Sequence, residues 1–446
     1  MSAPRNLWAG LSLLASVASI AGVAGLAGLT AAGPVSAATA SSGVVAITGA
    51  KVYTLGRAGT LDDATVVVEN GRIRAVGKGI AIPAGARTID ARGKVVTPGL
   101  FDSLTQIGLV EVNAVAGTRD GTEQNDHITA AFDVADALNP RSILIPVNRI
   151  EGLTGAVVAP TPGKSLLAGR GAVIHLGGGP DLLVRSPVAM FAVLGEDGAR
   201  RAGGSRAGAM LLLRSALDDA LDYAAHKAAW ERAERRPYSL SHLDLEALVP
   251  VARGELPLVV AVERASDVEA ALRLAKERRL KLILSGAEEG WMVADQIAAA
   301  KVPVLLNPMQ DLPSNFEKLG ATLENAARLH RAGVTLAFMT GDSHNARNLR
   351  QGAGNAVAYG LPWDEALKAM TVNPARIWHL ENRLGSLEPG KEADLVIWDG
   401  DPLELTTGAV QVFIHGVEMP MKSRQTELRD RYKNLGGPLP PAYDKP

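Results

Sequence analysis

Short β-rich runs separated by turn residues occupy residues 44–96, which follow an apolar leader. The runs occupy residues 44–47, 51–55, 64–68, 72–76 and 87–90. Asn70 and Gly71 stand between the third and fourth runs, and this pair favours a two-residue hairpin turn because both residues tolerate positive φ. The pattern predicts a small β domain. Strand-like runs return near the end of the chain, at 393–398 and 410–414.

The intervening region of about 280 residues alternates apolar strand-like runs with amphipathic helical stretches. The expected strands lie at 156–159, 172–176, 258–262, 281–284, 302–306 and 334–339. The expected helices lie at 207–236, 267–279 and 323–332. This alternation predicts a parallel α/β fold, a (β/α)8 TIM barrel, whose typical length is about 250 residues.

The first forty residues are predicted to be an export signal. Arg5 precedes an uncharged run over residues 7–38, and small residues near Ala37 and Ala40 fit a cleavage site. An uncleaved membrane anchor is the open alternative, since the run exceeds the ~20 residues that span a bilayer. We favour export to the periplasm or the extracellular space, with no membrane partner after cleavage.

Composition excludes several classes of partner. The 46 Lys and Arg residues balance 47 Asp and Glu residues, so no electrostatic argument favours nucleic acid or an anionic membrane. Hydrophobic residues make up 47% of the 446 positions, as in ordinary globular proteins. The chain has no cysteine, so a transition-metal site must use histidine and carboxylate ligands.

Two terminal stretches, residues 95–108 and 384–402, resemble the signature motifs of the amidohydrolase superfamily, in particular its imidazolonepropionase-like members. The first family motif reads Pro-Gly-Leu-Ile-Asp-x-His-x-His, and residues 373–378 add a third similar stretch. The resemblance implies a β domain built from both chain ends. The expected boundaries are a signal at 1–40, a composite β domain at 41–96 plus 385–425, a barrel at 97–384 and a flexible tail at 426–446.

The resemblance also implies where metal ligands would lie, and most of these positions are substituted. Family members place His-x-His after the first barrel strand, one histidine each after the fifth and sixth, and an aspartate after the eighth. Here these positions hold Leu104 and Gln106, then Ala261, Ser285 and Asp342. Family members normally bind zinc or another divalent metal, which acidifies water. For this chain we predict no metal ligands and no cofactor.

Asp342 and His344 are the candidate catalytic residues, since Asp342 matches the aspartate that takes a proton from water in active relatives. The alternative is that Asp342 caps the next element and His344 lies on an exposed loop. Gln106, Glu263 and Ser285 are candidate pocket residues that replace or adjoin the family ligands.

Other acidic residues leave further alternatives open. Glu263 would pair with Arg264 or with a cation at the barrel rim. Glu288 and Glu289 are expected to be solvated or to cap a helix. A relocated metal site is a further hypothesis, with ligands drawn from Glu123, Asp126, His127, Glu263 and Asp342.

Three functions follow from these observations. The first is an exported hydrolase of non-peptide C–N bonds in a cyclic amide or peptide-like substrate, with its metal-dependent activity lost or strongly altered. The second is a silent barrel that binds a small molecule. The third is a silent barrel that serves as an assembly partner. It would form a homo-oligomer, or a hetero-oligomer with an active amidohydrolase.

Overall fold

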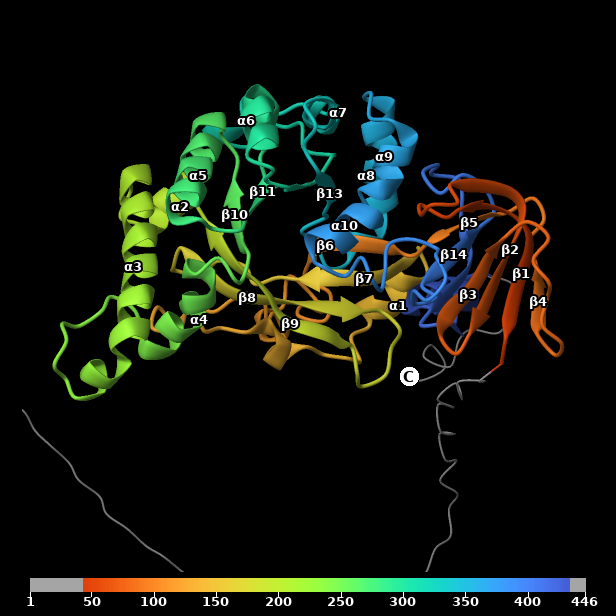
Figure 1. Cartoon of the computed structure of the whole chain (residues 1–446), viewed down its shortest axis with the longest axis horizontal. Coiled ribbons are helices and arrows are strands. Elements are labelled where there is room, and N and C mark those ends of the chain that lie inside the picture. The colour runs from red at the N-terminus through yellow and green to blue at the C-terminus, as the bar shows by residue number, and fades with distance from the viewer. Residues whose placement is uncertain (1–42, 434–446) are drawn as a thin grey trace, which may run out of the picture. The chain divides into compact units, whose positions relative to one another are not determined.

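Two eight-stranded sheets organise the chain, which a computed structural model describes over residues 43–433 (Figure 1). The predicted signal at 1–40 lies outside the described residues. Within them, no helix is long and apolar enough to cross a membrane.

The first sheet joins the two ends of the described chain in the order β16-β15-β14-β5-β1-β2-β3, with β4 paired to β1. Its strands are β1 (Val45–Tyr53), β2 (Thr60–Glu69), β3 (Arg72–Gly77), β4 (Arg87–Asp90), β5 (Val95–Pro98), β14 (Leu395–Trp398), β15 (Ala409–Ile414) and β16 (Val417–Glu418). β14 pairs antiparallel with β5, so early and late strands lie side by side (Figure 1). Asn70 and Gly71 take φ values of 50° and 77° at the turn of the β2–β3 hairpin, as predicted.

The second sheet runs from β6 to β13 in sequence order. Its strands are β6 (Leu100–Thr105), β7 (Leu153–Val158), β8 (Leu167–His175), β9 (Leu183–Val193), β10 (Leu258–Val262), β11 (Leu282–Gly286), β12 (Val304–Leu306) and β13 (Leu336–Phe338). Two contacts join β6 to the chain that follows β13, because Gly341 N donates to Leu104 O at 2.9 Å and Thr340 N donates to Asp102 Oδ1 at 3.2 Å. The sheet is therefore a nearly closed, TIM-like barrel.

The expected strict alternation of strands and helices is wrong in one part of the barrel. β8 pairs antiparallel with both β7 and β9, and no helix separates these three strands. The other seven strands run in one direction, because β6 is parallel to β7 and β9 to β13 are parallel in sequence order.

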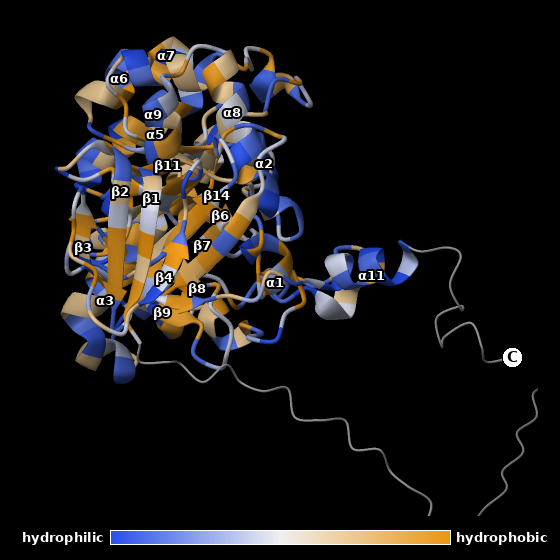
Figure 2. Cartoon of the chain, turned by 90° about the vertical axis from the view of Figure 1, so that its right-hand side faces the viewer, coloured by the Kyte–Doolittle hydropathy of each residue, from blue (hydrophilic) through white to orange (hydrophobic). Residues whose placement is uncertain are grey.

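Apolar side chains fill the barrel interior. One buried cluster takes a residue from every strand of the second sheet, including Phe101, Val157, Val173, Phe191, Val259, Ile283, Leu305 and Ala337. Alternate residues on the same strands belong to a second cluster that also contains helical residues. Strand residues are orange and many helical residues blue in Figure 2, as expected for a core of strands covered by amphipathic helices.

Helices follow β6 and most of the strands from β9 onward. They are α1 (Leu144–Arg149), α2 (Gly195–Arg201), α3 (Arg206–Glu231), α4 (His242–Ala252), α5 (Ala265–Arg278), α6 (Ala294–Ala299), α7 (Asn325–Arg331), α8 (Leu349–Ala358), α9 (Trp363–Lys368), α10 (Val372–Ile377) and α11 (Arg424–Tyr432). α11 overlaps the range predicted as a flexible tail, so the described part of that range is largely helical. A capping box at Ser423 and Thr426 begins the helix, none of its residues is buried, and it stands away from the strands (Figure 2).

Candidate functional site at the barrel mouth

The residues singled out from the sequence gather at one end of the barrel. Gln106, Glu263, Ser285 and Asp342 lie within or just beyond the carboxyl ends of β6, β10, β11 and β13, which run in the same direction. In parallel barrels this end carries the functional loops. We call it the barrel mouth.

On one side of the mouth, hydrogen bonds within the fold occupy Asp342 and its neighbours. Asp342 Oδ1 accepts from the backbone N–H groups of His344 at 3.0 Å and Asn345 at 3.2 Å. Asp342 therefore has the capping role that was the alternative to catalysis, because its carboxylate lies at the start of a short 3₁₀ helix at Asn345–Asn348. His344 Nε2 lies 3.3 Å from Gln425 Nε2 of α11. Gln106 Nε2 donates to Thr161 Oγ1.

Asp102 is a buried residue of this site that the sequence reasoning missed. Its side chain is fully buried in β6; Oδ1 accepts from the backbone N–H of Leu104 at 3.0 Å, and Oδ2 accepts from Thr340 Oγ1 at 2.5 Å. Burial raises the pKa of Asp102 to about 7, although these hydrogen bonds oppose the shift. An aspartate inside a strand with no other charged residue was the signal that could have identified it.

On the other side of the mouth, one lysine lies between two carboxylates. Lys318 Nζ is 3.4 Å from Glu263 Oε1 and 3.2 Å from Glu288 Oε1, which follow the fifth and sixth barrel strands. Of the two partners predicted for Glu263, the structure has the rim cation, which is Lys318. Arg264 pairs with Asp267 instead, at 2.9 Å. Burial raises the pKa of Glu288, and Lys318 opposes that shift.

Of the two alternatives predicted for Glu288 and Glu289, solvation or helix capping, solvation is wrong, since they are 6% and 8% exposed. The structure gives both a local role: Glu288 pairs with Lys318, and Glu289 accepts from the backbone N–H of Ala265 and of Gly320, each at 3.1 Å. The tight turn after β11, with Gly286 and Ala287 at positive φ, directs the two side chains back into the fold.

A second set of ion pairs continues around the mouth. Arg206 Nε lies 3.0 Å from Asp267 Oδ2, and its guanidinium also lies 3.3 Å from Glu317 Oε2. Glu317 Oε1 accepts from the backbone N–H of Glu196 at 2.7 Å, at the start of α2. Gly195 permits this contact, because a Cβ there would lie 2.2 Å from Glu317 Oε2.

The residues at the mouth do not fit the metal that the family resemblance implies. Leu104 and Ala261 have no donor atom, and Ser285 Oγ points to Met339 Sδ at 3.4 Å. Leu104 and Met339 pack against the apolar barrel interior. The cation at the ends of the fifth and sixth strands is the ammonium of Lys318.

The proposed relocated metal site does not form among residues 43–433. His127 has 91% of its side chain exposed, and its nearest carboxylate partner is Asp126 at 3.9 Å. One group in this range has donor atoms close enough to share a metal, and it lies elsewhere, at Glu392, Asp394 and His415.

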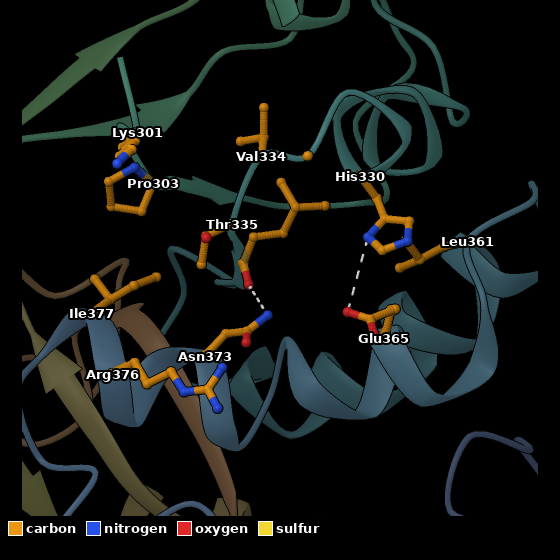
Figure 3. Close-up of a pocket in the computed structure, with 12 residues that line it drawn as sticks. Lys301, Pro303, His330, Val334, Thr335, Leu361, Glu365, Asn373, Arg376 and Ile377 are labelled. Carbon is orange, nitrogen blue, oxygen red and sulfur yellow. Dashed lines mark hydrogen bonds and ion pairs between the residues drawn. The ribbon is translucent and has the colours of Figure 1, made fainter. Parts of the chain in front are cut away.

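A further pocket of about 440 Å³ opens at the amino ends of β12 and β13 (Figure 3). Asn373 Nδ2 donates to Leu336 O at 2.9 Å in its wall, and His330 Nδ1 lies 3.9 Å from Glu365 Oε2. This end of a parallel barrel normally serves stability. None of its residues was predicted from the sequence to line a pocket.

Comparison with known proteins identifies the family. Residues 261–423 match the Amidohydrolase family. The chain is 26% identical over 386 residues to amidohydrolase tasK of Hapsidospora irregularis, with 79% of this chain and 39% of tasK covered. It is also 26% identical over 386 residues to an imidazolonepropionase of Cereibacter sphaeroides, with 78% of this chain and 91% of that protein covered.

The solved structure of an amidohydrolase from Thermotoga maritima MSB8 superposes with a TM-score of 0.76 at 29% identity, over 84% of this chain and 99% of that one. The superposition with this structure extends over the fold. The family match at residues 261–423 includes the motif at residues 384–402. The chain therefore belongs to the amidohydrolase superfamily, as an imidazolonepropionase-like member.

Proposed function

We propose that this chain has lost, or strongly altered, the metal-assisted hydrolysis of non-peptide C–N bonds that its family implies. The observation that most supports this proposal is the position of the Lys318 ammonium between Glu263 and Glu288. A divalent metal beside the same strand ends would meet this fixed positive charge and too few donor atoms.

The energetic argument concerns the attacking water. A catalytic metal lowers the pKa of bound water from 15.7 to about 7. Asp342 acting alone forgoes that help, and its Oδ1 already accepts two backbone hydrogen bonds. We expect the resulting increase in the barrier to be several kcal/mol.

The test is a hydrolysis assay of the untagged chain on cyclic amides and N-acyl dipeptides, with added zinc, manganese or iron. We expect turnover at the buffer background for the wild type, Asp342→Ala and the surface control Asp364→Ala alike. Metal-stimulated turnover that Asp342→Ala abolishes and Asp364→Ala retains would sink the proposal and restore a hydrolase with substituted ligands.

A second candidate function is assembly with an active amidohydrolase. The alignment with tasK covers most of this chain but 39% of tasK, so a unit like this one forms part of a longer protein named as an amidohydrolase. Sedimentation of this chain with active family members of the same organism tests the idea. A complex that changes kcat/KM of the active member supports it, and separate sedimentation of the two proteins contradicts it.

Export and a small-molecule ligand remain predictions. Their tests are the amino-terminal sequence of the secreted protein and mass spectrometry of molecules that co-purify with it.

A further inference from the structure

The geometry points to a binding site for one zinc-type divalent ion formed by Glu392, Asp394 and His415, where the composite β sheet meets the barrel. One donor atom from each side chain lies within 4.8 Å of the other two. The site is independent of the proposed function, because it lies at the opposite end of the barrel from the mouth.

The end of β8 lies beside this site, because β8 runs opposite to the other barrel strands. His175 ends β8 and pairs with Gly155 near the beginning of β7, so it lies where the parallel strands start. The rings of His175 and His415 are 4.7 Å apart between centroids. His415 lies in the turn between β15 and β16, at φ 50°.

The three side chains already face one another. Glu392 Oε2 lies 3.2 Å from His415 Nε2, and Asp394 Oδ1 accepts from the backbone N–H of His415 at 2.7 Å. Asp394 is 8% exposed, and within the described residues its second oxygen, Oδ2, has no hydrogen-bond partner. Oδ2 is not one of the enclosed side-chain oxygens of the described residues that lack a partner, so it is open to water or to a cation.

The donor set suits a borderline metal. Zinc takes nitrogen and oxygen ligands at about 2.0–2.2 Å in tetrahedral geometry, which places neighbouring donors about 3.4 Å apart. Glu392 Oε2 and His415 Nε2 are already 3.2 Å apart, close to that value. The side chain of His415 is 40% exposed, so an ion can enter and water can complete the coordination.

Neighbouring groups would hold the ligands in place. Arg383 Nε donates to Glu392 Oε1 at 2.7 Å, which leaves Oε2 to face the site. His175 uses Nδ1 to accept from the backbone N–H of Gly177 at 3.0 Å, while its Nε2 contacts Asp181 O. His175 therefore packs beside the site and does not coordinate in this arrangement. An ion would link the start of β14 to the β15–β16 turn.

The experiment uses untagged, chelator-treated protein titrated with ZnCl₂ by calorimetry and with CoCl₂ by visible absorption. We expect one ion per chain, a visible cobalt spectrum of low-symmetry coordination, and at least tenfold weaker binding in His415→Gln. His344→Gln, which alters a histidine at the mouth, is the matched control and should bind as the wild type does.

Circular dichroism establishes that each variant is folded, and Glu392→Gln replaces His415→Gln if the latter is not. Absence of saturable binding, or unchanged affinity in the folded variant, overturns the inference. Zinc binding that Asp342→Ala abolishes and His415→Gln retains overturns it as well. That last result would also contradict the metal-free mouth, whereas the first two leave the proposed function untouched.

Discussion

At the scale of single residues, the mouth shows how the fold accommodates charges in an apolar barrel. Asp102 is held by Leu104 and Thr340, and it links the first strand to the chain after the last one. Lys318 performs a comparable task for Glu263 and Glu288. Both arrangements place ionisable groups where desolvation penalises charge, and each therefore has a measurable energetic signature.

The first prediction concerns pH and Asp102. Its pKa is about 7 in the folded chain and about 3.9 in an unfolded chain, so between these values the folded state binds more protons. The contribution of Asp102 to the free energy of unfolding is therefore complete below about pH 4 and is lost as the pH rises through 7. Urea unfolding of wild type and Asp102→Asn at pH 4, 5.5, 7 and 8 should show wild type losing stability relative to the variant. Asp62→Asn, at an exposed site, should follow the wild-type curve; parallel curves for Asp102→Asn would contradict the prediction.

The second prediction concerns Lys318→Met. Removal of one partner from a buried ion pair costs about 3–5 kcal/mol, because the remaining charges lose their counter-ion. Glu288 has 8% of its side chain exposed and Lys318 17%, so solvent gives little compensation. Chemical denaturation should show this loss, and the triple variant with Glu263→Gln and Glu288→Gln should recover most of it. Lys78→Met, at an exposed position, should change stability by less than about 0.5 kcal/mol.

At the scale of elements, short helices and turns position the mouth. α2 begins at Gly195, and Glu317 from the segment after β12 accepts from the backbone of its first turn. This contact connects the segment that follows the seventh barrel strand to the one that follows the fourth. The identity of Gly195 therefore matters more than a loop glycine normally would.

The third prediction compares two glycines. Gly195 has φ +67° and no room for a Cβ beside Glu317, whereas Gly203 has φ +85° with nothing within 4 Å. Alanine at either position adopts a left-handed backbone at a cost of about 1–2 kcal/mol. Gly195→Ala should lose at least about 1 kcal/mol more than Gly203→Ala in thermal or urea unfolding, because Glu317 must also move. Equal losses would show that the contact with Glu317 is unimportant.

The sequence predicted some elements better than others for identifiable reasons. Turn chemistry identified the hairpin at Asn70, and β-branched runs identified most strands of the first sheet, although β1 was predicted as two runs and β5 and β16 were not predicted. β9 was missed, because Arg185, Ser186 and Pro187 interrupt its first half. The direction of β8 was also hidden, since an apolar run carries no information about which way its partner runs.

The residues of the candidate site were also predicted unequally from the sequence. Motifs placed Gln106, Ser285 and Asp342 at strand ends, because spacing along the chain is preserved there. Lys318 could not be found in this way, since it reaches Glu263 and Glu288 only through the folding of the segment after β12. Partnerships between distant segments depend on tertiary packing, which local patterns do not encode.

At the scale of the whole molecule, the composite sheet and the barrel share one junction. Trp398 of β14 is fully buried, its Nε1 donates to Thr97 Oγ1 at 2.9 Å, and a Cβ at Gly152 would lie 2.4 Å from its ring. Within the described residues, 43–433, both sheets belong to one compact unit. Loss of this contact should therefore affect both sheets together.

The fourth prediction tests this coupling with Trp398→Ala. Truncation of a buried tryptophan costs about 3–5 kcal/mol. Hydrogen exchange followed by mass spectrometry should show protection falling by similar amounts in peptides from β1 to β3 and from β10 to β11. Trp230→Ala, at a half-buried position of α3, should have a smaller and more local effect. Protection lost in the first sheet alone would indicate two independent folding units.

The pairing of β5 with β14 is also delayed during biosynthesis. β5 ends at Pro98 and its partner begins at Leu395, so about 300 residues must be translated between them. At about 5–20 residues per second, the edge of β5 waits about 15–60 s for its neighbour. An open strand edge is a template for wrong pairing during that interval. We therefore expect the edge of β5 to stay open to wrong pairing until the last strands leave the ribosome.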